Sequence, residues 1–218
     1  MSLNKIASNK LDLRFLRPLL VLGMLFSCSG CVLAGYAAKV YGAPPVKPAY
    51  VPAKTPMVVL AHDMPDPTGM RMDADIVTRE VETQIATYAI APLVPSWKVD
   101  EVRRAHLSGF ENMSPQQLGT EAGASQVLFI DILSSSVSAG PASDMVKGDI
   151  TTRVSIVDVP TGRQLWPTDG SNGAIVSYST PSVRLTDRNT ALGISRAIHA
   201  GVGVNIVRLF RTYKPDDD

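Results

Sequence analysis

The apolar and polar positions of this chain change their spacing several times, and each change predicts a different element. Residues 57–61 form a continuous apolar run between prolines, which is typical of a buried strand. Asp73 or Asp75 can cap a helix that ends before Pro92. The apolar residues expected on one face of that helix are Ile76, Val81, Ile85 and Tyr88. Residues 97–107 fit either a short amphipathic helix or a small edge strand.

A second helix begins with stronger local signals. Ser114 offers a side-chain acceptor at the N-cap position, and Pro115 occupies the first helical position. Gln117, at the third position, completes a capping box. Gly123 follows where a left-handed residue commonly ends a helix. These residues predict a short helix between Ser114 and Gly123.

The pattern then changes to that of strands. Residues 126–132 are apolar on both faces, as in a central strand, whereas residues 150–156 alternate, as in a sheet with one wet face. A Pro-Thr-Gly turn at 160–162 leads into residues 164–166, and residues 175–178 follow a glycine-rich loop. The middle of the chain is therefore expected to form an antiparallel meander.

A long final helix is expected to open at Thr186 or Asp187. Its apolar residues recur at helical spacing: Ile194, Ile198, Val202, Ile206 and Leu209. Gly201 and Gly203 each cost about 1 kcal/mol relative to alanine in a helix interior, so close packing against the sheet is the expected reason for them. The order of elements predicts an α+β fold: a mixed or antiparallel sheet of four or five strands, with helices packed on it and a long C-terminal helix.

The first 31 residues carry the pattern of an export signal. Four basic residues precede an apolar run over residues 18–26, and small residues then lead to Cys28 and Cys31. Residues 18–34 are borderline for a bilayer-spanning helix, which needs about 20 predominantly apolar residues. A cleaved signal fits this pattern better than an uncleaved anchor helix, and an ordinary signal peptide is a further alternative.

The tripeptide Ser29-Gly30-Cys31 resembles the lipobox of bacterial lipoproteins, in which a small residue precedes a cysteine that is diacylated and becomes the new N-terminus. The resemblance implies lipidation, with acyl chains such as palmitate, at Cys31. Cys28, in Leu25-Phe26-Ser27-Cys28, is the alternative site. More than one acyl chain is needed for a stable anchor, and a diacylglyceryl cysteine supplies that. Because Val32 follows Cys31, the sorting habit of the family implies the outer membrane, with the domain facing the periplasm.

Composition divides the chain into four parts. Residues 1–31 are the signal segment with the lipidation site, and residues 32–56 form a proline-rich linker that favours polyproline II. Residues 57–214 form the folded domain, and residues 215–218 an acidic tail. At about 3.1 Å per residue, the linker can hold the domain several nanometres from a membrane.

Charge and cysteine content narrow the classes of function. The chain has 21 Lys and Arg against 20 Asp and Glu, and the basic residues are scattered. This distribution argues against a nucleic-acid interface. Both cysteines lie in the signal segment, so the domain is expected to be held together by packing and not by internal disulfides.

Two stretches of the body resemble one group of bacterial envelope domains. Residues 118–132 read as a helix that ends in Gly-Ala and leads into a core strand, and residues 158–166 form a Thr-Gly hairpin ending in Leu-Trp. This order is similar to that of the curli-secretion lipoprotein, the lipoprotein activators of penicillin-binding proteins and the N-terminal domain of the Tol-system protein. The resemblance implies an α+β periplasmic domain over about residues 57–213. The long insertions of a curli-type pore are not evident in this sequence.

The candidate chemistry is sparse. His62, Asp63 and Asp66 follow the first predicted strand, and a strand terminus is a common location for a metal site. Their spacing matches no diagnostic metal motif, and the sequence contains no nucleophile elbow, P-loop or dinucleotide fingerprint. We therefore expect no metal, no cofactor and no catalytic residue.

These observations predict a lipid-anchored envelope protein that acts non-enzymatically, through a protein partner in the envelope or through self-association. Such a protein is expected to expose an apolar or edge-strand surface and to have no concave pocket with shifted titrating groups. An anchored hydrolase or metal-dependent enzyme is the alternative, and it requires a pocket near His62, Asp63 and Asp66. A binder of small ligands in the same compartment is a further alternative.

Overall fold

The computed structural model describes residues 43–63, 72–107, 109–139, 145–184 and 188–215. Two compact units are present, one of residues 47–212 and one of residues 1–46 together with 213–218. In the smaller unit, Val46 and Tyr213 form an isolated antiparallel bridge.

Several of the predictions concern residues outside the described ranges. These are the signal segment with Cys28 and Cys31, the loop residue Asp66, and the expected start of the final helix at Thr186 or Asp187. Among the described helices, none combines the length and the apolar character that are needed to cross a membrane.

The larger unit consists of a sheet and helices. The strands are β1 (Met57–Asp63), β2 (Gln126–Ala139), β3 (Met145–Asp158), β4 (Gln164–Trp166), β5 (Ala174–Ser179) and β6 (Val183–Arg184). The α-helices are α2 (Met72–Thr87), α3 (Ser96–Ala105), α4 (Pro115–Ala122) and α5 (Arg188–Arg208), and the 3-10 turn η1 covers Phe110–Asn112. The ambiguous segment 97–107 is thus mainly helix α3.

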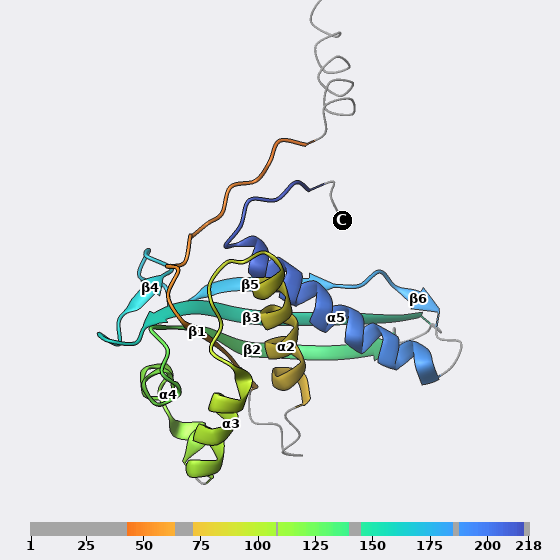
Figure 1. Cartoon of the computed structure of the whole chain (residues 1–218). Helices are drawn as coiled ribbons and strands as arrows, with labels where there is room; N and C mark the ends of the chain where they lie inside the picture. Colours follow the sequence, from red (N-terminus) through yellow and green to blue (C-terminus); the bar gives the residue numbers. More distant parts are fainter. Residues whose placement is uncertain (1–42, 64–71, 108, 140–144, 185–187, 216–218) are drawn as a thin grey trace, which may run out of the picture. The chain divides into compact units, whose positions relative to one another are not determined.

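The sheet is mixed, with β1 parallel to β2 and every other pair antiparallel. Its order is β1-β2-β3-β4, and β5 and β6 also pair with β3 (Figure 1). The predicted α+β class, the mixed sheet and the long C-terminal helix are confirmed, and one short strand that was not predicted, β6, raises the strand number from five to six. The predicted meander is wrong at one step, because β5 pairs with β3 and not with β4. Strand β4 is only three residues long and leaves most of β3 free for β5.

One face of the sheet is covered by α2 and α5, and the other face is covered by α3 and α4 only near β1 and the start of β2. Residues of β1 alternate between two apolar clusters, since Val59 belongs to the cluster under α2 and α5, whereas Val58 belongs to the cluster with α3 and α4. Figure 1 shows α2 and α5 crossing one face together. The helix α4 has the predicted capping box of Ser114 and Gln117, and Gly123 ends it with a φ of 75°.

Helix α2 buries a different stripe from the one expected. Val77, Val81 and Ile85 are fully buried, whereas Ile76 and Tyr88 are exposed. The buried positions follow each other at four-residue steps, and Ile76 lies one position away from that stripe. The expectation for Val81 and Ile85 is therefore confirmed and that for the other two residues is wrong.

Helix α5 uses its two glycines for close approaches to two different elements. A Cβ atom at Gly201 would lie 2.4 Å from ring atoms of Tyr178 on β5, which confirms close packing against the sheet. A Cβ atom at Gly203 would instead lie 2.6 Å from Glu80 on α2, so this glycine serves a helix–helix contact.

The second half of the proline-rich segment packs against the larger unit. Pro52 is buried, and the ring of Tyr50 lies 6.5 Å from that of Trp166. The buried amide of Gln126 donates to the carbonyl oxygens of Ala53 and Thr55. These contacts explain why the compact unit begins at Lys47.

Candidate functional site

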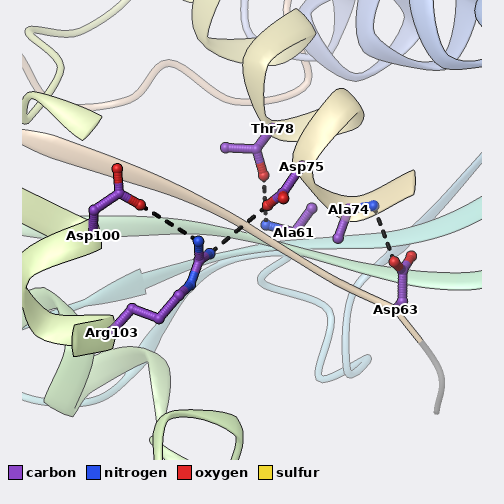
Figure 2. Close-up of polar contacts among 7 residues, drawn as sticks. All are labelled: Ala61, Asp63, Ala74, Asp75, Thr78, Asp100 and Arg103. Atoms are coloured by element: carbon purple, nitrogen blue, oxygen red, sulfur yellow. Dashed lines mark hydrogen bonds and ion pairs between the residues drawn. The ribbon is translucent and has the colours of Figure 1, made fainter. Parts of the chain in front are cut away.

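The structure gives His62 and Asp63 separate surroundings. His62 Nδ1 lies 3.8 Å from the Asp131 carboxylate, and its ring stacks on Phe129. The Asp63 carboxylate accepts a hydrogen bond of 3.0 Å from the backbone N–H of Ala74, near the start of α2 (Figure 2). Asp63 therefore serves one of the N–H groups that a helix leaves unpaired in its first turn. Among the described residues, no three His, Cys, Asp or Glu side chains are placed to hold a metal ion.

A groove runs beside the outer edge of β1, between α2 and α3. Figure 2 shows Arg103 of α3 between Asp75 of α2 and Asp100 of α3. Its guanidinium lies 3.8 Å from Asp75 and 3.4 Å from Asp100, and all three side chains are about half exposed. The hydroxyl of Thr78 accepts a hydrogen bond from the outward N–H of Ala61. Part of this edge of β1 is therefore occupied, because Ala61 bonds to α2 and Met57 bonds to Pro92 and Val94.

Two pockets lie along this groove and share Asp75 and Arg103 in their linings. One, of about 310 Å³, contains Glu82, whose pKa is raised by burial. Arg79 opposes that increase in pKa and Asp100 adds to it. The other, of about 180 Å³, lies beside His62 and is lined mainly by apolar side chains, among them Phe110 and Phe129. A pocket therefore exists near His62, as the enzyme alternative required. The carboxylate with the raised pKa, that of Glu82, lies in the other pocket.

A buried histidine, which the sequence did not single out, lies between α2 and α5. His199 is 1% exposed, and its Nε2 lies 3.0 Å from the carboxylate of Asp73. Contact with His199 lowers the pKa of Asp73, burial opposes this, and the hydroxyl of Ser135 lowers the pKa further. Serine, histidine and aspartate thus come together in an order that differs from a catalytic triad. Here the serine bonds to the carboxylate, whereas in a triad it bonds to the imidazole.

Strand β5 lies at the edge of the sheet away from β1. The hydrogen bonds around β5 show which of its residues direct their N–H and C=O groups toward β3 and which direct them outward. The N–H of Thr180 donates to Gly148 of β3, and the carbonyl of Val176 accepts from the Thr152 hydroxyl of β3. Even-numbered residues of β5 therefore face β3. Since backbone direction alternates along a strand, the odd-numbered residues direct N–H and C=O away from the sheet.

Those outward groups form an open edge, which we define as the backbone of Ile175, Ser177 and Ser179. Within the described part of the chain, only the carbonyl of Ser177 has a hydrogen-bond partner, the side-chain amide of Asn205 on α5, at 3.1 Å. Ile175 is 60% exposed, and both serines are exposed as well. The edge is thus accessible along β5 except at the carbonyl of Ser177, where Asn205 is bound.

The sequence of β5, AIVSYS, lacks the features by which proteins usually protect such an edge. It contains no charged residue and no proline, and its pairing with β3 runs without a bulge. Natural sheets commonly protect an edge with lysine, proline, a bulge or a covering segment, because unpaired N–H and C=O groups can template another strand. The open edge therefore has the chemistry needed for strand addition.

Side chains on the outer face hold β5 firmly against β3. The hydroxyls of Thr151 and Ser177 lie 3.1 Å apart, and the hydroxyl of Ser179 donates to Asp149. The same carboxylate pairs with Lys147. Contacts with Lys147 and then with Ser179 lower the pKa of Asp149. The open edge is thus presented by an ordered strand.

Comparisons with known proteins add a likeness to solved structures. No family model and no curated protein matches the sequence. Lipoprotein GNA1162 of Neisseria meningitidis is 17% identical with a TM-score of 0.43, over 72% of this chain and 98% of that chain. A minor lipoprotein of Acinetobacter baumannii is 9% identical with a TM-score of 0.40, over 71% and 91%. The LpoB C-terminal domain of Escherichia coli is 15% identical with a TM-score of 0.36, over 69% and 94%.

These similar structures include bacterial lipoproteins. At such low identities and TM-scores, nothing about the activity or partners of this chain follows from the likeness.

Proposed function

We propose that this chain is a lipid-anchored protein of the cell envelope that acts without catalysis, by pairing its open β5 edge with a β-strand of another polypeptide. The observation that carries the proposal is the open edge itself. It presents outward backbone groups on an exposed strand that has no charge, proline or bulge to protect it. Strand addition uses such groups for affinity and uses alternate side chains for specificity.

The side chains around the edge suit a partner strand with apolar and small polar residues. Ile175 offers an exposed apolar contact, and Ser177 and Ser179 lie on the same outer face. Cross-strand pairs of this kind contribute a few tenths of a kcal/mol to about 1 kcal/mol each. Most of the affinity would therefore come from the backbone.

The absence of catalysis is part of the proposal. Two carboxylates with lowered pKa values, Asp73 and Asp149, support it through their contacts, whereas Glu82, whose pKa is raised, lies in a pocket. Asp73 contacts His199 and Ser135, and Asp149 contacts Lys147 and Ser179. These contacts join α2 to α5 and β5 to β3, which is a structural use.

Anchoring is proposed to occur through Cys31, with Cys28 as the alternative, and in the outer membrane. The intact mass of the membrane-fraction protein tests this part. A diacylated N-terminal cysteine that is lost in Cys31→Ser and kept in Cys28→Ser would support Cys31. A chain without lipid in the wild type would overturn the anchoring.

The binding part is tested by placing a photo-reactive phenylalanine analogue at Ile175 in cells. Leu192 on α5 is a matched control, because the two residues are 60% and 62% exposed. Covalent adducts with a polypeptide are expected at position 175 and not at 192. Equal labelling at both positions, or none at 175, would contradict the proposal.

A second variant separates strand addition from simple proximity. Ser177→Pro removes an outward N–H that no described group uses, and proline is tolerated in edge strands. The variant should lose the adduct at position 175 and unfold at only a slightly lower temperature, because it loses the contact between the Ser177 and Thr151 hydroxyls. An adduct that persists would mean that the partner is held by side chains and not by the backbone.

A further inference from the structure

We propose that the strand added at the open β5 edge is β5 of a second copy of this chain, paired antiparallel about a two-fold axis at Ser177. The inference rests on the proposed function and names its partner. Every position needed for the pairing lies between Ala174 and Arg184 or on the adjoining strand β3.

The outward residues determine the register. Ile175, Ser177 and Ser179 are the positions that direct N–H and C=O away from the sheet, and Ser177 is central among them. In an antiparallel pair, facing residues of this type exchange both hydrogen bonds. Ser177 would then face Ser177 of the second copy, and Ile175 would face its Ser179. This arrangement forms about six backbone hydrogen bonds, with each outward N–H donating to a carbonyl of the other copy.

The register also determines which charged residues of the outer face share a row between the copies. Along β3, Arg153 is paired with Ile175, and Asp149 is paired with Ser179. In the two-fold arrangement, Arg153 of one copy shares a cross-strand row with Asp149 of the other. The two β5 strands lie between these side chains, whose Cα atoms would be about 14 Å apart, and within each copy Arg153 already pairs with Asp131 and Asp149 with Lys147.

The surface beyond the ends of β5 is also self-complementary. A hollow of about 450 Å³, lined by residues that include Trp166, Gly173 and Ile175, adjoins the start of the strand. The same register carries Pro181 and Val183 of the second copy toward this hollow. Val183 is 39% exposed, so an apolar side chain is available to enter it.

Self-pairing also produces a sheet of ordinary size. Strands β1, β2, β3 and β5 of two copies would form one continuous sheet of about eight strands, within the range in which twisted sheets remain open. The pairing covers the open edge of β5, and the Ser177 carbonyl, which already accepts from Asn205 of α5, would take a second donor from the other copy. Lipid anchoring of both copies in one membrane would raise their effective concentration and favour a small interface.

Single cysteines test the register in the full chain, with Cys28 and Cys31 retained so that anchoring is undisturbed. Residues 177 of the two copies would have Cα atoms about 5.5 Å apart, within the range for a disulfide. Residues 175 of the two copies would lie about 14 Å apart, which no disulfide can span. Ile175→Cys is therefore a control that is exposed but wrongly placed.

Oxidation of membranes from cells that express each variant should give a linked dimer for Ser177→Cys and none for Ile175→Cys or the wild type. Combining Ile175→Cys with Ser179→Cys should restore the dimer, because these positions face each other between copies. Within one chain the same two cysteines lie about 14 Å apart and cannot join.

The outcomes separate the two proposals. A dimer with Ile175→Cys that equals the dimer with Ser177→Cys would overturn the register. If no Ser177→Cys dimer forms while the photo-adducts at position 175 contain another protein, self-pairing is wrong and strand addition stands. If position 175 gives no adduct of any kind, both proposals fail.

Discussion

Gly201 offers a sharp test of how α5 is seated on β5, because helix propensity and packing predict opposite effects of one methyl group. In a helix interior, alanine is favoured over glycine by about 1 kcal/mol. At Gly201 the added Cβ would lie 2.4 Å from the Cε2 and Cζ atoms of the half-buried Tyr178 ring. Overpacking of this kind costs about 1–3 kcal/mol. We expect Gly201→Ala to lower the free energy of unfolding by about 1 kcal/mol.

Gly193 in the same helix supplies the control. A Cβ atom added at Gly193 would have no neighbouring atom within 4 Å, so only propensity acts there. Gly193→Ala should raise the free energy of unfolding by up to about 1 kcal/mol. The two alanine variants should therefore differ by about 2 kcal/mol, or roughly 4–8 °C in Tm for a domain of this size.

Urea unfolding followed by circular dichroism measures both variants under the same conditions. A Tyr178→Ala background should convert Gly201→Ala from destabilising to stabilising, since the ring that meets the methyl group is gone. If Gly201→Ala stabilises the wild-type protein as much as Gly193→Ala does, α5 does not pack on β5 as described, and the reasoning is refuted.

Three further predictions concern polar contacts. The pKa of Asp73 lies below its ordinary value of 3.8 in the folded protein. Its contact with His199 therefore stabilises the fold above pH 3.8, and this stabilisation is lost as the pH falls through the pKa that Asp73 has in the folded state. Asp73→Asn should thus cost less than about 1 kcal/mol at neutral pH and show a shallower loss of stability on acidification, measured by urea unfolding across pH; an unchanged pH profile would contradict this. Ser114→Ala removes the acceptor for the N–H of Gln117 and should cost about 1 kcal/mol; an unchanged urea midpoint would count against the cap. Arg103→Met should change stability by less than about 1 kcal/mol, because the ion pairs of this side chain are exposed; a loss above about 2 kcal/mol would show that they hold the groove together.

The elements specified by short-range interactions could be predicted from the sequence. The capping box of α4 needs only Ser114 and Gln117, three residues apart, and the end of this helix needs only the left-handed conformation of Gly123. The buried strand β1 and the apolar face of α5 likewise follow from spacing within one segment. In each case the residues that interact, or that share a buried face, are close along the chain.

The open edge of β5 could not be predicted, because it depends on which strands pair with β3. Its sequence predicts a strand. Because β4 covers just one end of β3, β5 pairs directly with β3 and forms the edge of the sheet there. The contact between His199 and Asp73 likewise could not be predicted from the spacing of residues in the sequence, since it joins residues that are far apart in the chain.

The sequence by itself therefore determined the class of fold, most of the helices and strands, and the expectation of an exported, lipid-anchored chain. Only the tertiary structure decided that Ala61 and Met57 of β1 bond to other segments, whereas β5 keeps all its outward backbone groups except the Ser177 carbonyl unpaired among the described residues. The physical reason is that local propensity and periodicity choose the conformation of a segment. Its neighbours are chosen by contacts between distant residues, which depend on how all the segments bury their apolar faces together.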